Sequence, residues 1–165
     1  MAIRDLNDTH IPAILAVVND GAEAYRGVIP ADRWRDPYMA EDELRSEMAA
    51  GVAFLGEFDG DALIGVMGLQ RVKDVCLIRH AYVCTSLQGK GVGSRLMAAL
   101  TEKADAPLLV GTWATAAWAI GFYEKHGFRL TEPDEKTRLL RTYWTIPDRQ
   151  VETSVVLAEA GFKLD

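Results

Sequence analysis

The chain has 165 residues, of which 49% are hydrophobic and 25% are charged. That is enough apolar material for one domain with its own core, and too much for a disordered chain. The formal net charge of −6 argues against a nucleic-acid partner, because such binding depends on neutralising phosphates with Lys and Arg. The sequence shows no apolar signal stretch and no run long enough to cross a membrane, so we expect a cytoplasmic protein with no membrane partner.

The predicted elements of the first half alternate between helix and strand. They are a strand at 3–6, a helix capped by Asn7 or Asp8, an irregular segment at 20–38, a helix that stops at Gly51, a strand at 52–58, a hairpin turn at 59–61 and a strand at 62–72. The irregular segment is rich in Gly, Pro, Arg and aromatic residues. It is therefore expected to be a loop.

The second half continues the same alternation. It predicts a strand at 75–83, a glycine loop, a helix from Val92, a strand at 107–113, a helix capped by Thr115 that ends at Gly127, a strand from Phe128, a helix at about 134–145 capped by Asp134, and a last strand at 151–157. We find no repeat or linker. The fold class is therefore α/β with a mixed sheet, in one domain over residues 1–165.

Cys76 and Cys84 lie in or beside one predicted strand. Eight residues of extended chain separate them by much more than a disulfide can span. We expect two buried thiols, with neither a disulfide nor a metal site.

The glycine loop Gln88-Gly89-Lys90-Gly91-Val92-Gly93 lies between an apolar strand and an amphipathic helix. Glycines let the backbone approach an anion closely, and the N–H groups at a helix start favour negative charge. The spacing does not fit a dinucleotide-binding GxGxxG, and there is no GxxxxGK[ST] for a nucleoside triphosphate. A loop that only reverses the chain is the alternative.

A second motif is the segment Ala119-Ile120-Gly121-Phe122-Tyr123-Glu124-Lys125-His126-Gly127-Phe128. Ala119, Phe122, Tyr123 and His126 fall on one helical face, and Gly127 suits a left-handed helix end. One strand-like run separates this motif from the glycine loop.

Together the two motifs resemble the Gln/Arg-x-x-Gly-x-Gly/Ala and Phe-Tyr-x-x-x-Gly-Phe signatures of the GNAT family of acyl-CoA N-acyltransferases. The resemblance covers essentially the whole chain and implies the element order β-α-α-β-β-β-α-β-α-β. It also implies a sheet that opens between the fourth and fifth strands, where acyl-CoA enters. The extra helix at about 134–145 departs from this pattern.

The resemblance implies acetyl-CoA as the co-substrate. Its pyrophosphate is expected in the glycine loop and its pantetheine arm along the preceding strand. The implied binding residues are Tyr82, Val83, Gln88, Gly89, Lys90, Gly91, Val92, Gly93 and Ser94. The family often has an asparagine at the position of Ala116, so that contact is expected to be lost or supplied by a group such as Thr115.

The implied reaction is attack of an amine on the thioester, for which Tyr123 matches the family's general acid. A helix-face core residue is its alternative role. The family's occasional base glutamate corresponds to Leu77 here. His80 on the same strand is a candidate base, but alternation places it opposite Leu77, Ala81 and Val83, which favours packing. Other acceptor-side acids are not singled out by the sequence, namely Asp32, Glu43 and Glu47, and a water chain is a further alternative.

The acceptor is expected to contact the irregular segment and the end of the fifth strand. The candidate residues are Tyr25, Arg26, Trp34 and Trp113. Arginine could bind a carboxylate or phosphate, or could simply pack on aromatic rings. Trp113 and Trp118 are expected to flank the site, and buried packing is the default for both. Exposed Tyr143 and Trp144 would suit a homodimer.

The function expected from the sequence is transfer of an acetyl group to the primary amine of a small-molecule or amino-acid-like acceptor. A protein N-acetyltransferase is one alternative. A non-catalytic acyl-CoA-binding or sensing module and a structural protein with a degenerate site are two others.

Overall fold

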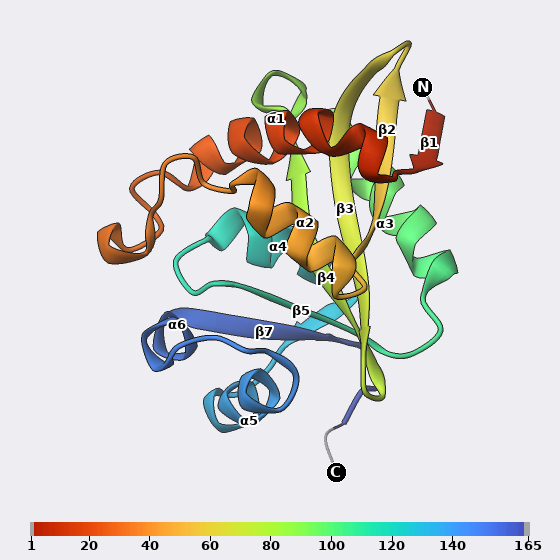
Figure 1. Cartoon of the computed structure of the whole chain (residues 1–165). Coiled ribbons are helices and arrows are strands. Elements are labelled where there is room, and N and C mark those ends of the chain that lie inside the picture. Colours follow the sequence, from red (N-terminus) through yellow and green to blue (C-terminus); the bar gives the residue numbers. More distant parts are fainter. Residues whose placement is uncertain (1, 164–165) are drawn as a thin grey trace.

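Residues 2–163, which the computed structural model describes, form seven strands and six α-helices (Figure 1). The strands are β1 (Ala2–Asp5), β2 (Ala53–Asp59), β3 (Ala62–Val72), β4 (Val75–Val83), β5 (Leu108–Trp113), β6 (Phe128–Leu130) and β7 (Ser154–Glu159). The helices are α1 (Ile11–Gly21), α2 (Glu41–Ala49), α3 (Val92–Lys103), α4 (Ala117–Lys125), α5 (Pro133–Tyr143) and α6 (Asp148–Thr153).

All seven strands belong to one sheet with the order β1-β2-β3-β4-β5-β7-β6. Every neighbouring pair is antiparallel except β4 and β5, which run parallel. The predicted α/β fold with a mixed sheet is confirmed, as is the additional helical segment before the last strand.

Three local predictions at helix and strand ends are wrong. The Thr115 hydroxyl does not cap α4 but donates to the Val28 carbonyl over 3.1 Å. Helix α5 begins at Pro133, with Glu132 at the N-cap position, because proline at the first helical position has its φ already set for a helix. The β-branched residues from Val151 onward predicted a strand, yet Val151 lies buried in α6, which starts after Pro147.

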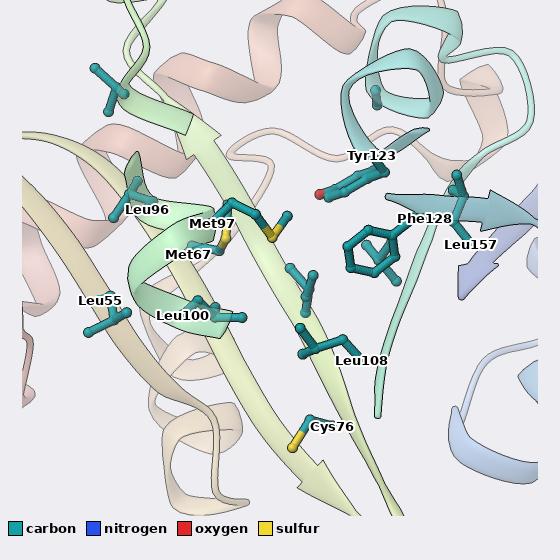
Figure 2. Packing of buried hydrophobic residues seen from close by; sticks show 14 of the residues in the cluster. Leu55, Met67, Cys76, Leu96, Met97, Leu100, Leu108, Tyr123, Phe128 and Leu157 are labelled. Carbon is teal, nitrogen blue, oxygen red and sulfur yellow. The ribbon is translucent and has the colours of Figure 1, made fainter. Parts of the chain in front are cut away.

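The two faces of the sheet are covered by different helices (Figure 1). One face packs on α3 and α4, and Figure 2 shows part of this core. The other face packs on α1 and α2 near β2 and β3, and on α5 near β5 and β7. Helices α5 and α6 therefore close the half of the sheet that α1 and α2 leave open.

The sheet opens between β4 and β5. The two strands pair at only three positions, Cys76–Leu108, Leu77–Leu109 and Ile78–Val110. Beyond them β4 runs on to Val83 and β5 to Trp113, and the two strands do not pair there within the described residues. The opening predicted between the fourth and fifth strands is therefore present.

A β-bulge interrupts β4 at His80. Gly68 pairs with Arg79 and Val66 with Tyr82, so His80 and Ala81 together oppose a single residue of β3. His80 has a φ of +52°, in the left-handed region that few non-glycine residues adopt.

The bulge reverses which side chains face which helices. Before it, Leu77 faces the α5 side, whereas after it Ala81 and Val83 face the α3 and α4 side. The His80 ring stacks on Phe54, which belongs to the α1 and α2 side. The prediction that His80 lies on the face opposite Leu77 is therefore wrong, because the strand does not alternate through the bulge.

Candidate functional site

The glycine loop leaves β4 and enters α3 with two glycines in the left-handed region. Gly89 has a φ of +79° and Gly91, at the N-cap position of α3, a φ of +85°. A Cβ on Gly91 would lie 2.9 Å from the Arg95 Nη1 atom. The backbone conformation therefore favours glycine here, and a Cβ would also displace the end of the Arg95 side chain.

The start of α3 presents unpaired backbone donors. Arg95 is the residue whose N–H closes the first helical turn, on the Gly91 carbonyl at 3.0 Å. The N–H groups of residues 92–94 accordingly have no carbonyl within the helix. These donors and the positive end of the helix dipole form a site for an anion.

A half-buried ion pair attaches this loop to the sheet. The Arg95 guanidinium donates two parallel hydrogen bonds to Glu57 of β2, Nε to Oε1 over 2.8 Å and Nη2 to Oε2 over 2.7 Å. The Glu57 side chain is fully buried. Arg95 Nη1 also donates to the Lys90 carbonyl over 3.3 Å. One side chain thus holds the loop, the helix and the sheet in a single arrangement.

A cleft of about 490 Å³ runs from the glycine loop to the open part of β4. Its lining includes eight of the nine predicted co-substrate residues: Tyr82, Val83, Gln88, Gly89, Gly91, Val92, Gly93 and Ser94. Lys90 is exposed and contributes only its carbonyl, to Arg95.

A second cavity, of about 180 Å³, lies in the gap between β4 and β5. Tyr25, Ala81 and Tyr82 line both this cavity and the cleft, so the two adjoin. Tyr25 reaches the junction from the short helical turn at 22–25, where its ring contacts Trp118 with the centroids 4.9 Å apart. Trp113 at the end of β5 lines the smaller cavity.

Tyr123 of α4 forms part of the wall of the smaller cavity. Its side chain is 6% exposed and is held edge-on between Phe122 and Phe128. Figure 2 shows its hydroxyl directed away from α4 toward β4. Burial, with a smaller effect of Tyr25, raises the pKa of Tyr123 above its ordinary value. The phenol therefore keeps its proton at neutral pH.

Residues 18–142 match the family model described as "Acetyltransferase (GNAT) domain", which is well over half of the chain. The chain belongs to the GNAT acetyltransferase family. This bears out the resemblance carried by the two sequence motifs, and it makes the protein an acyltransferase.

Several solved structures share this fold. The PaiA N-acetyltransferase of Thermoplasma acidophilum in complex with coenzyme A matches with a TM-score of 0.70 at 18% identity, over 96% of this chain and 97% of that one. An acetyltransferase of Streptococcus agalactiae matches with a TM-score of 0.72 at 16% identity, over 96% of each chain. The ribosomal-protein-S18-alanine N-acetyltransferase of Escherichia coli matches with a TM-score of 0.67 at 18% identity, over 99% and 98%. No curated protein matches the sequence.

The cleft of this GNAT chain fits an acyl-CoA in chemical terms. A pyrophosphate needs donors and an approach free of side chains, and the loop offers both at Gly89 and Gly91. A Cβ on Gly93 would lie 3.2 Å from the Phe122 ring, so this glycine permits α3 to pack closely on α4. Beyond the bulge, β4 has no paired neighbour on the β5 side, which leaves backbone groups for a pantetheine arm.

Two of the predicted acceptor residues, Arg26 and Trp34, line neither cavity. The Arg26 guanidinium lies 4.5 Å from the centre of the Trp34 ring and pairs with Glu23 and Asp36. Arginine packed on an aromatic ring was the alternative that the sequence left open, and the structure favours it.

Three aromatic residues lie elsewhere than predicted. Trp118 is 47% exposed at the mouth of the cleft, not buried. Tyr143 is buried and donates to Asp74 Oδ1 over 2.7 Å. Trp144 lies over Gly111, where a Cβ would be 3.5 Å from its ring, and lines the smaller cavity. The exposure that was expected of Tyr143 for a homodimer is therefore wrong, whereas Trp144 is half-buried.

The structure gives Thr115, one group that could replace the family's asparagine contact, a different partner. Ala116 is fully buried, and the Thr115 hydroxyl is engaged with Val28. This bond attaches the irregular segment to the start of α4. Position 115 thus helps to hold Tyr25 over the junction of the two cavities.

Sequence reasoning did not single out Glu47, which the structure pairs with two residues of β4. Its carboxylate lies 2.7 Å from His80 Nε2 and 2.5 Å from Arg79 Nη2, and its side chain is 18% exposed. The other two acids considered with it pair on the surface, Glu43 with Arg35 and Asp32 with Arg149. No signal in the sequence pointed to Glu47, because the contact depends on the bulge at His80.

Both cysteines are free. No group of three or more metal-ligating side chains is found within residues 2–163, and no helix there is long and apolar enough to span a membrane.

Proposed function

We propose that this GNAT chain transfers an acetyl group from acetyl-CoA to the primary amine of a small-molecule or amino-acid-like acceptor. The observation that carries the proposal is the pair of adjoining cavities, with Tyr123 in the wall of the smaller one. In this proposal the larger cleft holds the donor and the smaller cavity holds the acceptor. Their junction is the place where the thioester and the amine would meet.

The chemistry requires one new bond and one broken bond. The amine nitrogen attacks the thioester carbonyl, the C–N bond forms, and the C–S bond breaks. The protonated hydroxyl of Tyr123 is suited to give its proton to the departing sulfur. A backbone N–H near Val83, on the open edge of β4, is the proposed partner of the carbonyl oxygen.

The size and walls of the smaller cavity favour a small acceptor over a protein tail. Leu140, Trp144 and Ile146 from the α5–α6 region line it, together with Gln150 of α6. A volume of about 180 Å³ is small even for a small-molecule site. Helices α5 and α6 lie beside β7 (Figure 1), and residues of this region form one wall of the cavity.

The test is release of free thiol from acetyl-CoA in the presence of small primary amines, amino-acid amides and an unstructured peptide with a free N-terminus. We expect turnover with members of the first two groups. Tyr123→Phe should lower kcat by about 100-fold, the size of a typical acid–base contribution, and leave the Kd for CoA unchanged. Tyr143→Phe is the matched control, because it removes a buried phenol hydroxyl on α5 that binds Asp74.

Each alternative predicts a different result. Saturable CoA binding without turnover on the whole panel would indicate an acyl-CoA-binding or sensing module. Turnover confined to the peptide would indicate a protein N-acetyltransferase. Unchanged kcat in Tyr123→Phe would contradict the acid assignment.

A further inference from the structure

We propose that the acceptor carries a carboxylate beside its amine, as an apolar amino acid does, and that Gln150 and Ser154 bind this carboxylate. The inference rests on the proposed function and deepens it by naming the substrate class and the residues that select it. Both residues line the smaller cavity. Both lie in the segment from α6 to the start of β7, beyond residues 18–142 that match the family model.

The wall of the smaller cavity contains hydrogen-bond donors but no acid. Among the described residues that line it, none is Asp or Glu, and the charge of Arg79 is balanced by Glu47. A second ammonium group, as in a diamine, would find no carboxylate in this wall, and an unpaired charge in a closed site is costly. Leu140, Trp144 and Ile146 supply apolar surface. An anionic acceptor with an apolar side chain therefore suits the cavity better than a diamine does.

Gln150 presents its amide NH2 group as an unused donor. Arg33 Nη2 donates to Gln150 Oε1 over 3.1 Å. A guanidinium can only donate, so this bond settles which end of the amide carries the oxygen. The NH2 end makes no hydrogen bond to any of residues 2–163. Its N–H groups are therefore available to a ligand in the cavity that Gln150 lines.

Ser154 adds a second unused donor to the same wall. The residue is 6% exposed and begins β7, where it pairs with Trp113 of β5. Its hydroxyl has no hydrogen-bond partner in the part of the chain that the structure describes. Buried hydroxyl groups are nearly always paired, because an unsatisfied one destabilises the fold. A carboxylate oxygen in the cavity would supply the missing partner.

Arg33 places a positive charge behind Gln150. Its guanidinium forms no ion pair with a described residue, and its Nε is buried without a hydrogen-bond partner. This charge favours an anion on the other side of the amide. The hydrogen bond from Arg33 also polarises the amide, which makes its NH2 group a stronger donor. Arg33 is thus a positioning residue that acts on the acceptor through Gln150.

The residues that flank this pair join the same two segments. Arg149 of α6 lies 3.3 Å from Asp32, so adjacent residues of α6 contact adjacent residues of the short turn at 31–33. The members of each pair are 117 residues apart in sequence. The Asp32–Arg149 pair is exposed and stabilises little by itself. Together the two contacts hold the Gln150 amide against the irregular segment, beside the acceptor cavity.

The test measures kcat/KM with acetyl-CoA for leucine, leucinamide and isopentylamine, which differ only in the group beside the amine. All values are expressed per free amine. We expect leucine to be preferred about 10-fold over leucinamide and about 100-fold over isopentylamine, because hydrogen bonds to a charged group contribute more than those to a neutral one. The matching phenylalanine series should show the same order.

Gln150→Glu replaces the NH2 group with a negative charge. We expect kcat/KM for leucine to fall about 100-fold through like-charge repulsion, and that for isopentylamine to change less than about 3-fold. Ser154→Ala and Arg33→Met should each reduce the preference for leucine over isopentylamine by about 10-fold. A purely structural role would instead lower kcat/KM equally for all three acceptors.

Gln70→Glu is the matched control. Gln70 Oε1 also accepts a hydrogen bond from an arginine, Arg79 Nη1 over 2.8 Å, but Gln70 lines neither cavity. This variant should keep the wild-type preference among the three acceptors. Thermal unfolding and CoA binding, measured on every variant, separate lost folding from altered selection.

The outcomes distinguish this inference from the proposed function. Equal use of leucine and isopentylamine by the wild type, or a preference for a diamine, would show that the cavity does not select a carboxylate. Wild-type preference in Gln150→Glu would remove Gln150 from the site. Absence of turnover with every amine would contradict the proposed function instead. Titration of the CoA-loaded protein with N-acetyl-leucine and N-acetyl-leucinamide would then still test the carboxylate, and equal affinity for the two would overturn it.

Discussion

The donor side and the acceptor side of the site are built in different ways. The donor side consists largely of consecutive residues, those of the glycine loop and the first turn of α3. They line the part of the cleft where the pyrophosphate is expected. The acceptor side draws on the turn at 22–25, β4, β5 and the α5–α6 region, so its lining residues extend from Tyr25 to Ser154. A site built from consecutive residues can be recognised in the sequence as a short motif. A site assembled from distant elements has no such motif.

The two sides also differ in how the fold supports them. The glycine loop is attached to the sheet through Glu57 and Arg95. The acceptor side depends on an irregularity of the sheet, the bulge at His80, and on its pairing with Glu47. Single substitutions should therefore be able to weaken CoA binding without changing the acceptor side, and the reverse. This difference between the two sides can be tested.

The largest effect on the donor side is expected from Gly91→Val. A β-branched side chain at a φ of +85° is strained, and its Cβ would lie 2.9 Å from Arg95 Nη1. We expect CoA to bind roughly 100-fold more weakly, as the strain and the displaced guanidinium together distort the loop. Isothermal titration with CoA measures the change.

Gly60→Val serves as its control, because Gly60 has a φ of +61° in the β2–β3 hairpin with open space around its Cβ position. It should lower stability and leave CoA affinity as in wild type. Unaltered CoA binding in Gly91→Val would mean that the anion does not lie against this loop.

A smaller effect on the same side is expected from Glu57→Gln. The substitution keeps the shape of a fully buried side chain and removes the charge that binds Arg95 at two points. We expect the Kd for CoA to rise about 10-fold, because the loop is then held less firmly. Titration calorimetry at two salt concentrations measures the change.

The comparison variant is Glu135→Gln, which breaks a similar two-point pair with Arg129 between β6 and α5. It should lower the melting temperature without changing CoA affinity. Equal CoA affinity in Glu57→Gln and Glu135→Gln would show that the Glu57–Arg95 pair supports the sheet and not the loop.

Most of the fold could be predicted from local patterns. Apolar periodicity located the strands and helices up to β6, and Gly127, with a φ of +91°, ends α4 as expected. The failures lie where a nonlocal contact overrides a local preference. Thr115 has the chemistry of a cap, but its hydroxyl donates to the Val28 carbonyl. Val151 is buried in α6 against α5 instead of starting the last strand.

The acceptor side shows the same limit at the level of single residues. Strand alternation placed His80 correctly opposite Ala81 and Val83 but wrongly opposite Leu77, because a bulge is a property of the pairing between β3 and β4 and not of β4 alone. In the sequence Glu47 is one of several acids on an amphipathic helix. Only the folded sheet places Arg79 and His80 beside it. Arg26 has the side chain of a residue that could bind an anionic substrate, yet its guanidinium forms ion pairs with Glu23 and Asp36.

The smallest effect is expected from Tyr143→Phe, on the outer side of the helices that close the acceptor cavity. Tyr143 donates to Asp74, and this hydrogen bond is the main reason that the pKa of Asp74 is lowered. A carboxylate whose pKa is lower in the folded state than in the unfolded chain adds stability at pH values above the unfolded pKa of about 3.9. We therefore expect the variant to melt about 2 °C lower at pH 7, and the difference to shrink as the pH falls below about 4 and Asp74 takes up its proton. Calorimetric melting of both proteins from pH 3 to pH 7 measures this. A difference in melting temperature that stayed constant across this pH range would assign the effect to packing of the phenol. Turnover equal to wild type at pH 7 would show that the helices covering the acceptor side tolerate the loss of this hydrogen bond.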